Sequence, residues 1–107
     1  MERKILEPGQ LSEALKTLDG WTADGKMLKK SVKFANFAQA LDHVNRIGAL
    51  AEAADHHPDI TFGWGYADIA LTTHDRGGIT DVDISLAKKI DQLGTQAPSP
   101  ATPVPPA

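Results

Sequence analysis

Two segments of alternating apolar and polar residues flank one long helical segment, and this arrangement constrains the fold more than any other feature. The first segment joins a short strand at 21–23 to a strand from about Lys26 to Phe34. Asp24-Gly25 between them is a strong signal for a two-residue hairpin turn. The second segment holds strands of about Ile60 to Gly63 and Ala67 to Thr73. Two β-hairpins are therefore predicted.

The segment between the hairpins predicts a helix from about Phe37 to Asp55. Asn36 suits the N-cap, with Gln39 as its capping-box partner, and Pro58 prevents the helix from continuing. Helical spacing of apolar residues predicts a buried stripe formed by Phe37, Leu41, Val44, Gly48 and Ala51, widened by Ala40, Ile47 and Ala54.

Shorter helices are predicted on either side of this core. One covers about Leu11 to Leu18, and the other begins after Thr80 as its cap and is closed by Gly94. The order α-β-β-α-β-β-α predicts an α+β domain of two layers, a four-stranded antiparallel sheet with helices on one face. Lys30 breaks the apolar alternation of its strand, which predicts a position at the edge of the sheet.

Length and composition limit the function classes. We predict one domain over residues 1–94 and a disordered tail over 95–107, which holds five of the seven prolines. The net charge of -3 argues against nucleic acid as a direct ligand. The absence of cysteine excludes disulfides and thiolate chemistry and fits a cytoplasmic protein. No signal peptide or membrane anchor is expected.

Groups suited to acid–base chemistry concentrate between Glu52 and Asp83. His56 and His57 follow a helix end, whose partial negative charge favours the protonated ring. Glu52 lies four residues before His56 and is expected to orient that ring. Because strand ends and helix ends meet at one rim of a two-layer domain, we expect His74 to approach the pair.

Plainer explanations compete with a catalytic site. The adjacent histidines are equally well explained as residues at an exposed helix end, and His43 as a surface or core residue with satisfied hydrogen bonds. Asp83 suits the third position of a helix, where a carboxylate caps the first turn. A metal site is disfavoured, because adjacent helical residues point about 100° apart and the HExxH spacing is missing. Trp64 fits either packing or one wall of a slot for a flat ring.

One set of spacings is more specific than any of these features. Glu52-x3-His56-His57-Pro58, followed by Trp64, His74 and Asp83 at fixed gaps, resembles the signature of the pterin-4a-carbinolamine dehydratases. The sequence from Leu71 to Thr80 is also typical of that family. The resemblance covers about residues 10–93 and leaves out the proline-rich tail.

The resemblance implies dehydration of 4a-hydroxytetrahydrobiopterin to quinonoid dihydropterin, in the recycling of tetrahydrobiopterin, without a metal or organic cofactor. It implies that His56 and His74 act as acid and base while His57 holds the pterin. The remaining substrate-site residues that it implies are Glu52, Asp55, Trp64, Thr73 and Asp83. The substrate is the product of aromatic amino acid hydroxylases, which makes such an enzyme a functional partner.

The resemblance also admits a different class of function. Some relatives are transcription coactivators and others are assembly factors for carbon-fixation enzymes, so a binding module of the same fold is the alternative. The family forms dimers and dimers of dimers. The residues give the same expectation, since the hairpin from Ile60 to Thr73 has no internal proline and only Asp68 as a charge. Its edge is predicted to pair with a second copy.

Overall fold

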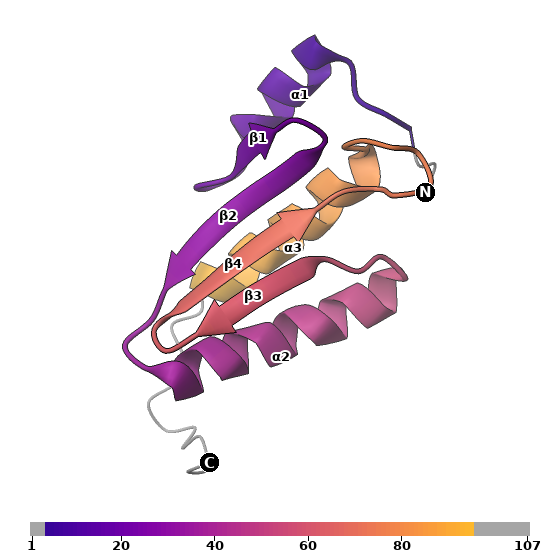
Figure 1. The fold of residues 1–107 in the computed structure, drawn as a ribbon. Coiled ribbons are helices and arrows are strands. Elements are labelled where there is room, and N and C mark those ends of the chain that lie inside the picture. The colour runs from indigo at the N-terminus through magenta and orange to yellow at the C-terminus, as the bar shows by residue number, and fades with distance from the viewer. Residues whose placement is uncertain (1–3, 96–107) are drawn as a thin grey trace.

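A computed structural model describes residues 4–95 and contains three helices and four strands (Figure 1). The predicted tail at 95–107 lies outside the described residues, except for Thr95. The order of the helices and strands confirms the predicted α+β arrangement. Their bounds are α1 Pro8–Leu15, β1 Thr22–Asp24, β2 Met27–Lys33, α2 Phe37–Ala54, β3 Asp59–Gly63, β4 Tyr66–Leu71 and α3 Asp81–Thr95.

All four strands form one antiparallel sheet in the order β1-β2-β4-β3. Both predicted hairpins are present, and the second strand of each meets in the centre of the sheet, with Lys30 opposite Ile69. The first turn is one residue later than predicted, at Gly25 and Lys26, and Gly25 adopts a φ of 63°. Strands β1 and β3 are therefore the two free edges.

Helices α2 and α3 lie on one face of this sheet, and the opposite face is open (Figure 1). Alternation along the central strands sends Leu28, Ile69 and Leu71 into the core between the layers. Helix α1 packs Leu11 and Leu15 against the same core near β1.

Helix α2 begins as predicted, because the Gln39 N–H donates to the Asn36 side chain at 2.9 Å. The predicted buried stripe is right in part. Ala40, Ile47 and Ala51 are buried as expected, but the fourth residue that α2 buries is His43, and Phe37 is 41% exposed. The buried face is thus shifted toward His43, and the start of the predicted stripe is left exposed.

The predicted edge position of Lys30 is also wrong, because β2 is an interior strand. The Lys30 ammonium donates to Asp91 of α3 at 2.8 Å and lies 5.9 Å from the centroid of the Trp21 ring. Asp91 also accepts a hydrogen bond from the Trp21 indole at 2.7 Å. This network explains how a lysine is tolerated on the apolar side of a central strand.

The outer helices differ from their predicted bounds at one or both ends. Helix α1 begins three residues earlier, because Pro8 suits the first helical position and Gln10 accepts a hydrogen bond from the Glu7 N–H at 2.9 Å. Helix α3 continues through Gly94 instead of ending there. None of the helices in residues 4–95 has the length and apolar character required to span a membrane.

Candidate active site

A pocket of about 430 Å³ lies where α2 ends, β3 begins and β4 ends. It brings together His56, His57 and His74, which the sequence separates by up to 18 positions. The full lining consists of Asp55, His56, His57, Thr72, His74 and Asp75. The rim of the two-layer domain thus gathers the three histidines in one place.

The end of α2 gives the two adjacent histidines different environments. Asp55 adopts a left-handed conformation, with φ 50° and ψ 44°, and ends the helix. The His56 N–H still bonds to the Ala51 carbonyl at 3.1 Å. As a result His56 is turned inward and is 5% exposed, whereas the His57 side chain is 55% exposed.

The predicted pairing of Glu52 with His56 is wrong. The Glu52 carboxylate contacts Nε2 of His57 instead. The helix stops at Ala54, so the four-residue spacing no longer places Glu52 and His56 on one helical face. Glu52 is 78% exposed and holds a ring at the surface.

Asp83 is the residue that holds His56. Its Oδ1 lies 2.5 Å from Nε2 of His56, and the carboxylate is fully buried. Its Oδ2 accepts hydrogen bonds from the Thr73 hydroxyl and the Thr80 N–H, both at 2.9 Å. Burial of an ionised carboxylate is tolerated when every oxygen has such partners. The capping bond predicted for Asp83 is therefore present, and its other oxygen orients a histidine.

Thr73 helps to hold the Asp83 carboxylate in place. Its side chain is fully buried, and its hydroxyl also lies 2.8 Å from that of Thr80. The Thr73 N–H donates to the Gly78 carbonyl at 3.0 Å, and its own carbonyl accepts from Gly77 at 2.8 Å. The backbone groups of Thr73 are thus used inside the loop, and its hydroxyl serves Asp83.

Trp64 does not line this pocket. It lies in the β3–β4 turn, at the far end of β3 from Pro58, and is 72% exposed. The five residues of β3 separate it from the histidines by about 17 Å.

Two lining residues were absent from the predicted set. The Thr72 hydroxyl donates to the Lys26 carbonyl at 2.6 Å, and Asp75 follows His74 in the exposed loop. Strand alternation gives a signal for Thr72, because it points to the opposite face from Thr73. Nothing in the residue pattern distinguishes Asp75 from an ordinary loop acid.

His43 is buried away from this pocket, and its Nε2 has no hydrogen-bond partner. The expectation of a satisfied core histidine is therefore wrong. Its ring packs on Phe34 with centroids 5.1 Å apart. Burial lowers the pKa of His43, the charges of Lys30 and Arg46 lower it further, and Asp42 opposes them. Within residues 4–95, no group of three or more histidines and acids is placed to hold a metal ion.

The model of the family described as Pterin 4 alpha carbinolamine dehydratase matches residues 4–93. This chain belongs to that family. A protein of Rubrobacter xylanophilus, provisionally named as a pterin-4-alpha-carbinolamine dehydratase, is 46% identical over 89 residues, 82% of this chain and 83% of its own length. A Mycobacteroides abscessus protein with the same provisional name is 45% identical over 91 residues, 84% of this chain and 97% of its own.

Two solved structures of pterin dehydratase relatives have similar folds. One is a transcriptional coactivator/pterin dehydratase from Brucella melitensis, with a TM-score of 0.80 and 34% identity over 84% of this chain and 98% of its own. The other is a pterin dehydratase-like protein identified as a RuBisCO assembly factor in the alpha-carboxysome. It has a TM-score of 0.57 and 27% identity, over 68% of this chain and 84% of its own. Similar folds in the family thus carry descriptions of both catalysis and assembly.

Proposed function

We propose that this protein dehydrates 4a-hydroxytetrahydrobiopterin to quinonoid dihydropterin and water. The observation that carries the proposal is the pocket lined by His56, His57 and His74, with His56 held by the buried carboxylate of Asp83. A carboxylate that serves only as a helix cap does not need to meet a histidine on its second oxygen. Membership of the family supplies the substrate class.

The reaction requires two proton transfers. The C4a–O bond breaks as the hydroxyl takes a proton and leaves as water, while N5 loses its proton and forms a double bond to C4a. Asp83 accepts from Nε2 of His56, so this nitrogen carries a proton and Nδ1 is the nitrogen available for exchange. We assign His56 and His74 to these two transfers, since both line the pocket.

The exposed side of the pocket has a binding role in this proposal. Glu52 holds the ring of His57, so that His57 donates to the pterin from a fixed position. Asp55 lines the same side and is a partner for the N–H groups of the pterin ring. Thr73 acts through Asp83, as a positioning residue.

The decisive experiment is the dehydration of chemically generated 4a-hydroxytetrahydropterin by the purified protein. We expect His56→Ala and His74→Ala each to lower kcat by about 10²–10⁴-fold, because each removes one of the two proton-transfer groups. His57→Ala should chiefly raise KM. Wild-type rates in the double variant His56→Ala/His74→Ala would contradict the assignment.

A metal requirement is tested in the same assay. Because the acid and the base are both histidines in this proposal, activity should survive prolonged treatment with EDTA. Loss of activity with EDTA and its return on addition of zinc would mean that the histidines serve as ligands instead.

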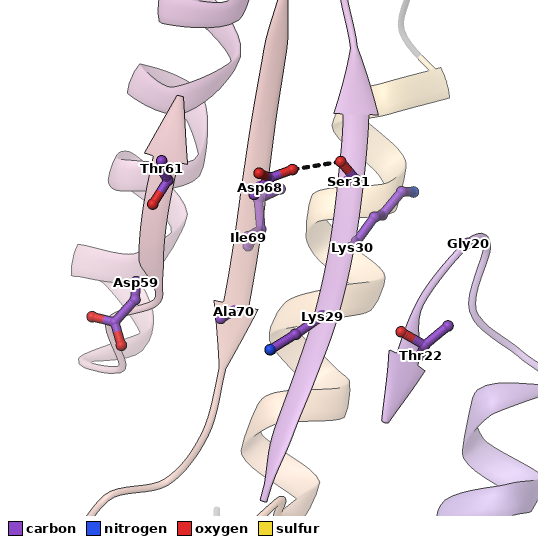
Figure 2. A pocket seen from close by; sticks show the side chains of 10 residues that line it. All are labelled: Gly20, Thr22, Lys29, Lys30, Ser31, Asp59, Thr61, Asp68, Ile69 and Ala70. Atoms are coloured by element: carbon purple, nitrogen blue, oxygen red, sulfur yellow. Dashed lines mark hydrogen bonds between the residues drawn. The ribbon is translucent and has the colours of Figure 1, made fainter. Parts of the chain in front are cut away.

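A binding module is the second candidate, and the open face of the sheet favours it. A hollow of about 540 Å³ crosses this face, with Lys29, Asp59 and Asp68 among its lining residues (Figure 2). It carries both signs of charge and suits a polar partner surface. If the protein lacks dehydratase activity, variants of this face become the relevant ones.

A further inference from the structure

We propose that the hollow on the open face of the sheet is the subsite for the C6 substituent of the pterin, and that it selects a neutral, hydroxylated chain. This inference rests on the proposed function, because that function places the ring of the substrate in the histidine pocket. It assigns the residues that contact the substituent and the chemistry that they favour.

The hollow and the histidine pocket adjoin along two neighbouring strands. Ala70 of β4 lines the hollow, and Thr72, two residues later, lines the pocket. Asp59 at the start of β3 lines the hollow, and His57, two residues earlier, lines the pocket. Residues two apart in a strand point to the same face and lie about 7 Å apart. The two cavities therefore occupy consecutive rows of residues on one side of the sheet.

The substrate needs a path out of the pocket for its substituent. In a 6-substituted pterin, C6 is bonded to N5, the nitrogen that loses its proton in the proposed reaction. The substituent therefore begins inside the pocket. A chain of three carbons with a terminal hydroxyl, together with a hydrogen bond of about 2.8 Å, spans the distance of about 7 Å to the next row of the sheet. A methyl group is too short to reach it.

Ala70 forms a notch in the row of the hollow that is nearest to the pocket (Figure 2). It pairs with Lys29 of β2 on one side and with Asp59 of β3 on the other. These two charged residues stand about 9–10 Å apart at their backbones, because neighbouring strands are about 4.7–4.9 Å apart. The single methyl group of Ala70 leaves the space between them open. A chain that leaves the pocket along β4 thus enters between an ammonium and a carboxylate.

Carboxylate oxygens in the hollow are available to accept hydrogen bonds. The Asp59 side chain has no hydrogen-bond or ion-pair partner among residues 4–95. Asp68, in the next row, accepts from the Ser31 hydroxyl at its Oδ1, at 2.5 Å, which leaves Oδ2 for a ligand. Hydroxyl groups of a substituent are suitable donors to both acids, since a carboxylate only accepts.

The charge balance of the hollow favours a neutral substituent. The Lys29 ammonium lies 3.0 Å from Asp24, which balances its charge. No lysine or arginine in the described part of the chain forms an ion pair with Asp59 or Asp68. A phosphate or carboxylate on the substituent would meet these two acids and be repelled. The hollow therefore favours a polyol chain over an anionic one.

Calorimetric titration of the full chain tests the subsite without an assay of catalysis. The probes are 7,8-dihydroneopterin, which carries a trihydroxypropyl chain, its monophosphate, and 6-methyl-7,8-dihydropterin. We expect dihydroneopterin to bind about 2- to 12-fold more tightly than the methyl compound, the equivalent of one net hydrogen bond. The monophosphate should bind more weakly than dihydroneopterin. Equal affinity for the hydroxylated and methyl compounds, or tighter binding of the monophosphate, overturns the inference.

Two variants locate the preference in the hollow. Ala70→Leu fills the notch, and Asp59→Ala removes the acceptor nearest to the pocket. Each should bring the ratio of the affinities for dihydroneopterin and the methyl compound close to one. Lys33→Ala is the matched control, because Lys33 lies on the same face of β2 but outside the hollow, and it should keep the wild-type ratio. A wild-type ratio in both Ala70→Leu and Asp59→Ala, or an equal loss in Lys33→Ala, overturns the subsite.

The same titrations separate this inference from the proposed function. If the wild type prefers dihydroneopterin as expected but does not dehydrate 4a-hydroxytetrahydropterin, the proposed reaction is wrong and the subsite stands. If it dehydrates that substrate but binds the hydroxylated and methyl compounds equally, the subsite is wrong and the reaction stands.

Discussion

Asp83 connects the folding of this chain to its chemistry at the level of a single residue. One oxygen caps α3 through the Thr80 N–H, and the other meets Nε2 of His56. The cap fixes the carboxylate to a rigid helix end, so the ring that it holds is equally fixed. The histidine tautomer is thus determined by a side chain that belongs to the fold.

Asp83→Asn should therefore lower kcat strongly and reduce the free energy of unfolding only slightly. A hydrogen bond to a charged group contributes about 1.5–3 kcal/mol, which corresponds to about 10–150-fold in rate. The amide retains the shape and can still accept from the Thr80 N–H, but it does not stabilise a protonated His56. The pH–rate profile of the variant should change along with kcat. Asp81→Asn, two residues away in the same helical turn, is the control and should leave both unchanged.

We expect His43 to make the stability of the fold depend on pH. A histidine with a lowered pKa binds fewer protons in the folded chain than in the unfolded chain. The stability that it contributes is therefore complete above the unfolded pKa of about 6.5 and is lost as the pH falls below it. The positive charges of Lys30 and Arg46 strengthen this effect, while the charge of Asp42 weakens it.

Replacement of His43 by leucine removes the titrating group and the unpartnered Nε2 together. We expect Tm of the wild type to fall more steeply between pH 7 and pH 5 than Tm of His43→Leu. Thermal unfolding followed by circular dichroism across this range measures both slopes. Equal slopes would mean that His43 does not carry the pH dependence.

At the level of elements, the turn between β3 and β4 depends on a close contact. The Tyr66 ring occupies the space above Gly63 where any other residue would place a Cβ. Gly63→Ala should destabilise the hairpin by about 0.5–1.5 kcal/mol, because the end of the Tyr66 side chain must move off its preferred rotamer. Gly48→Ala in α2 is the opposite case, because nothing lies within 4 Å of its added methyl group. It should stabilise the helix by about 0.5–1 kcal/mol. Chemical denaturation of the two variants should show shifts of opposite sign.

The sequence predicted the elements well because each carried a local signal. The Asn36 cap, the Thr80 cap and the two hairpins all rest on residues within a few positions of one another. Helical periodicity predicted three of the four residues that α2 buries, Ala40, Ile47 and Ala51, but not His43, because a polar ring gives no apolar signal. The ring of His43 packs on Phe34, which lies outside the helix.

In the candidate site, too, some features followed from local sequence signals and others depended on the packing of the folded chain. The expectation that a strand end and a helix end share one rim indicated that His74 approaches His56 and His57, and all three line one pocket. The partners of each ring did not follow from spacing, because the left-handed turn at Asp55 moves Glu52 from His56 to His57. Trp64, expected as one wall of a slot for a flat ring, lies at the far end of β3 from this pocket, because the strand between them is extended.

At the level of the whole molecule, the open edge of β3 gives a prediction that separates association from folding. Thr61→Lys adds a charge to β3, the free edge that is predicted to pair with a second copy, and a charge disfavours edge pairing, while within one chain the side chain of residue 61 is exposed. We expect the wild type to sediment at twice the monomer mass of 11.4 kDa and Thr61→Lys to sediment as the monomer. Its circular dichroism spectrum should remain that of the folded chain.

The monomeric variant should also reveal what the second copy contributes. The histidines and Asp83 all belong to one chain, so kcat should be nearly retained in the monomer. Thr22→Lys, on the other edge, should keep both the dimer and kcat. A Thr61→Lys protein that remains dimeric would place the association elsewhere on the molecule. A folded monomer with a strongly lowered kcat would show that the pocket depends on the second copy.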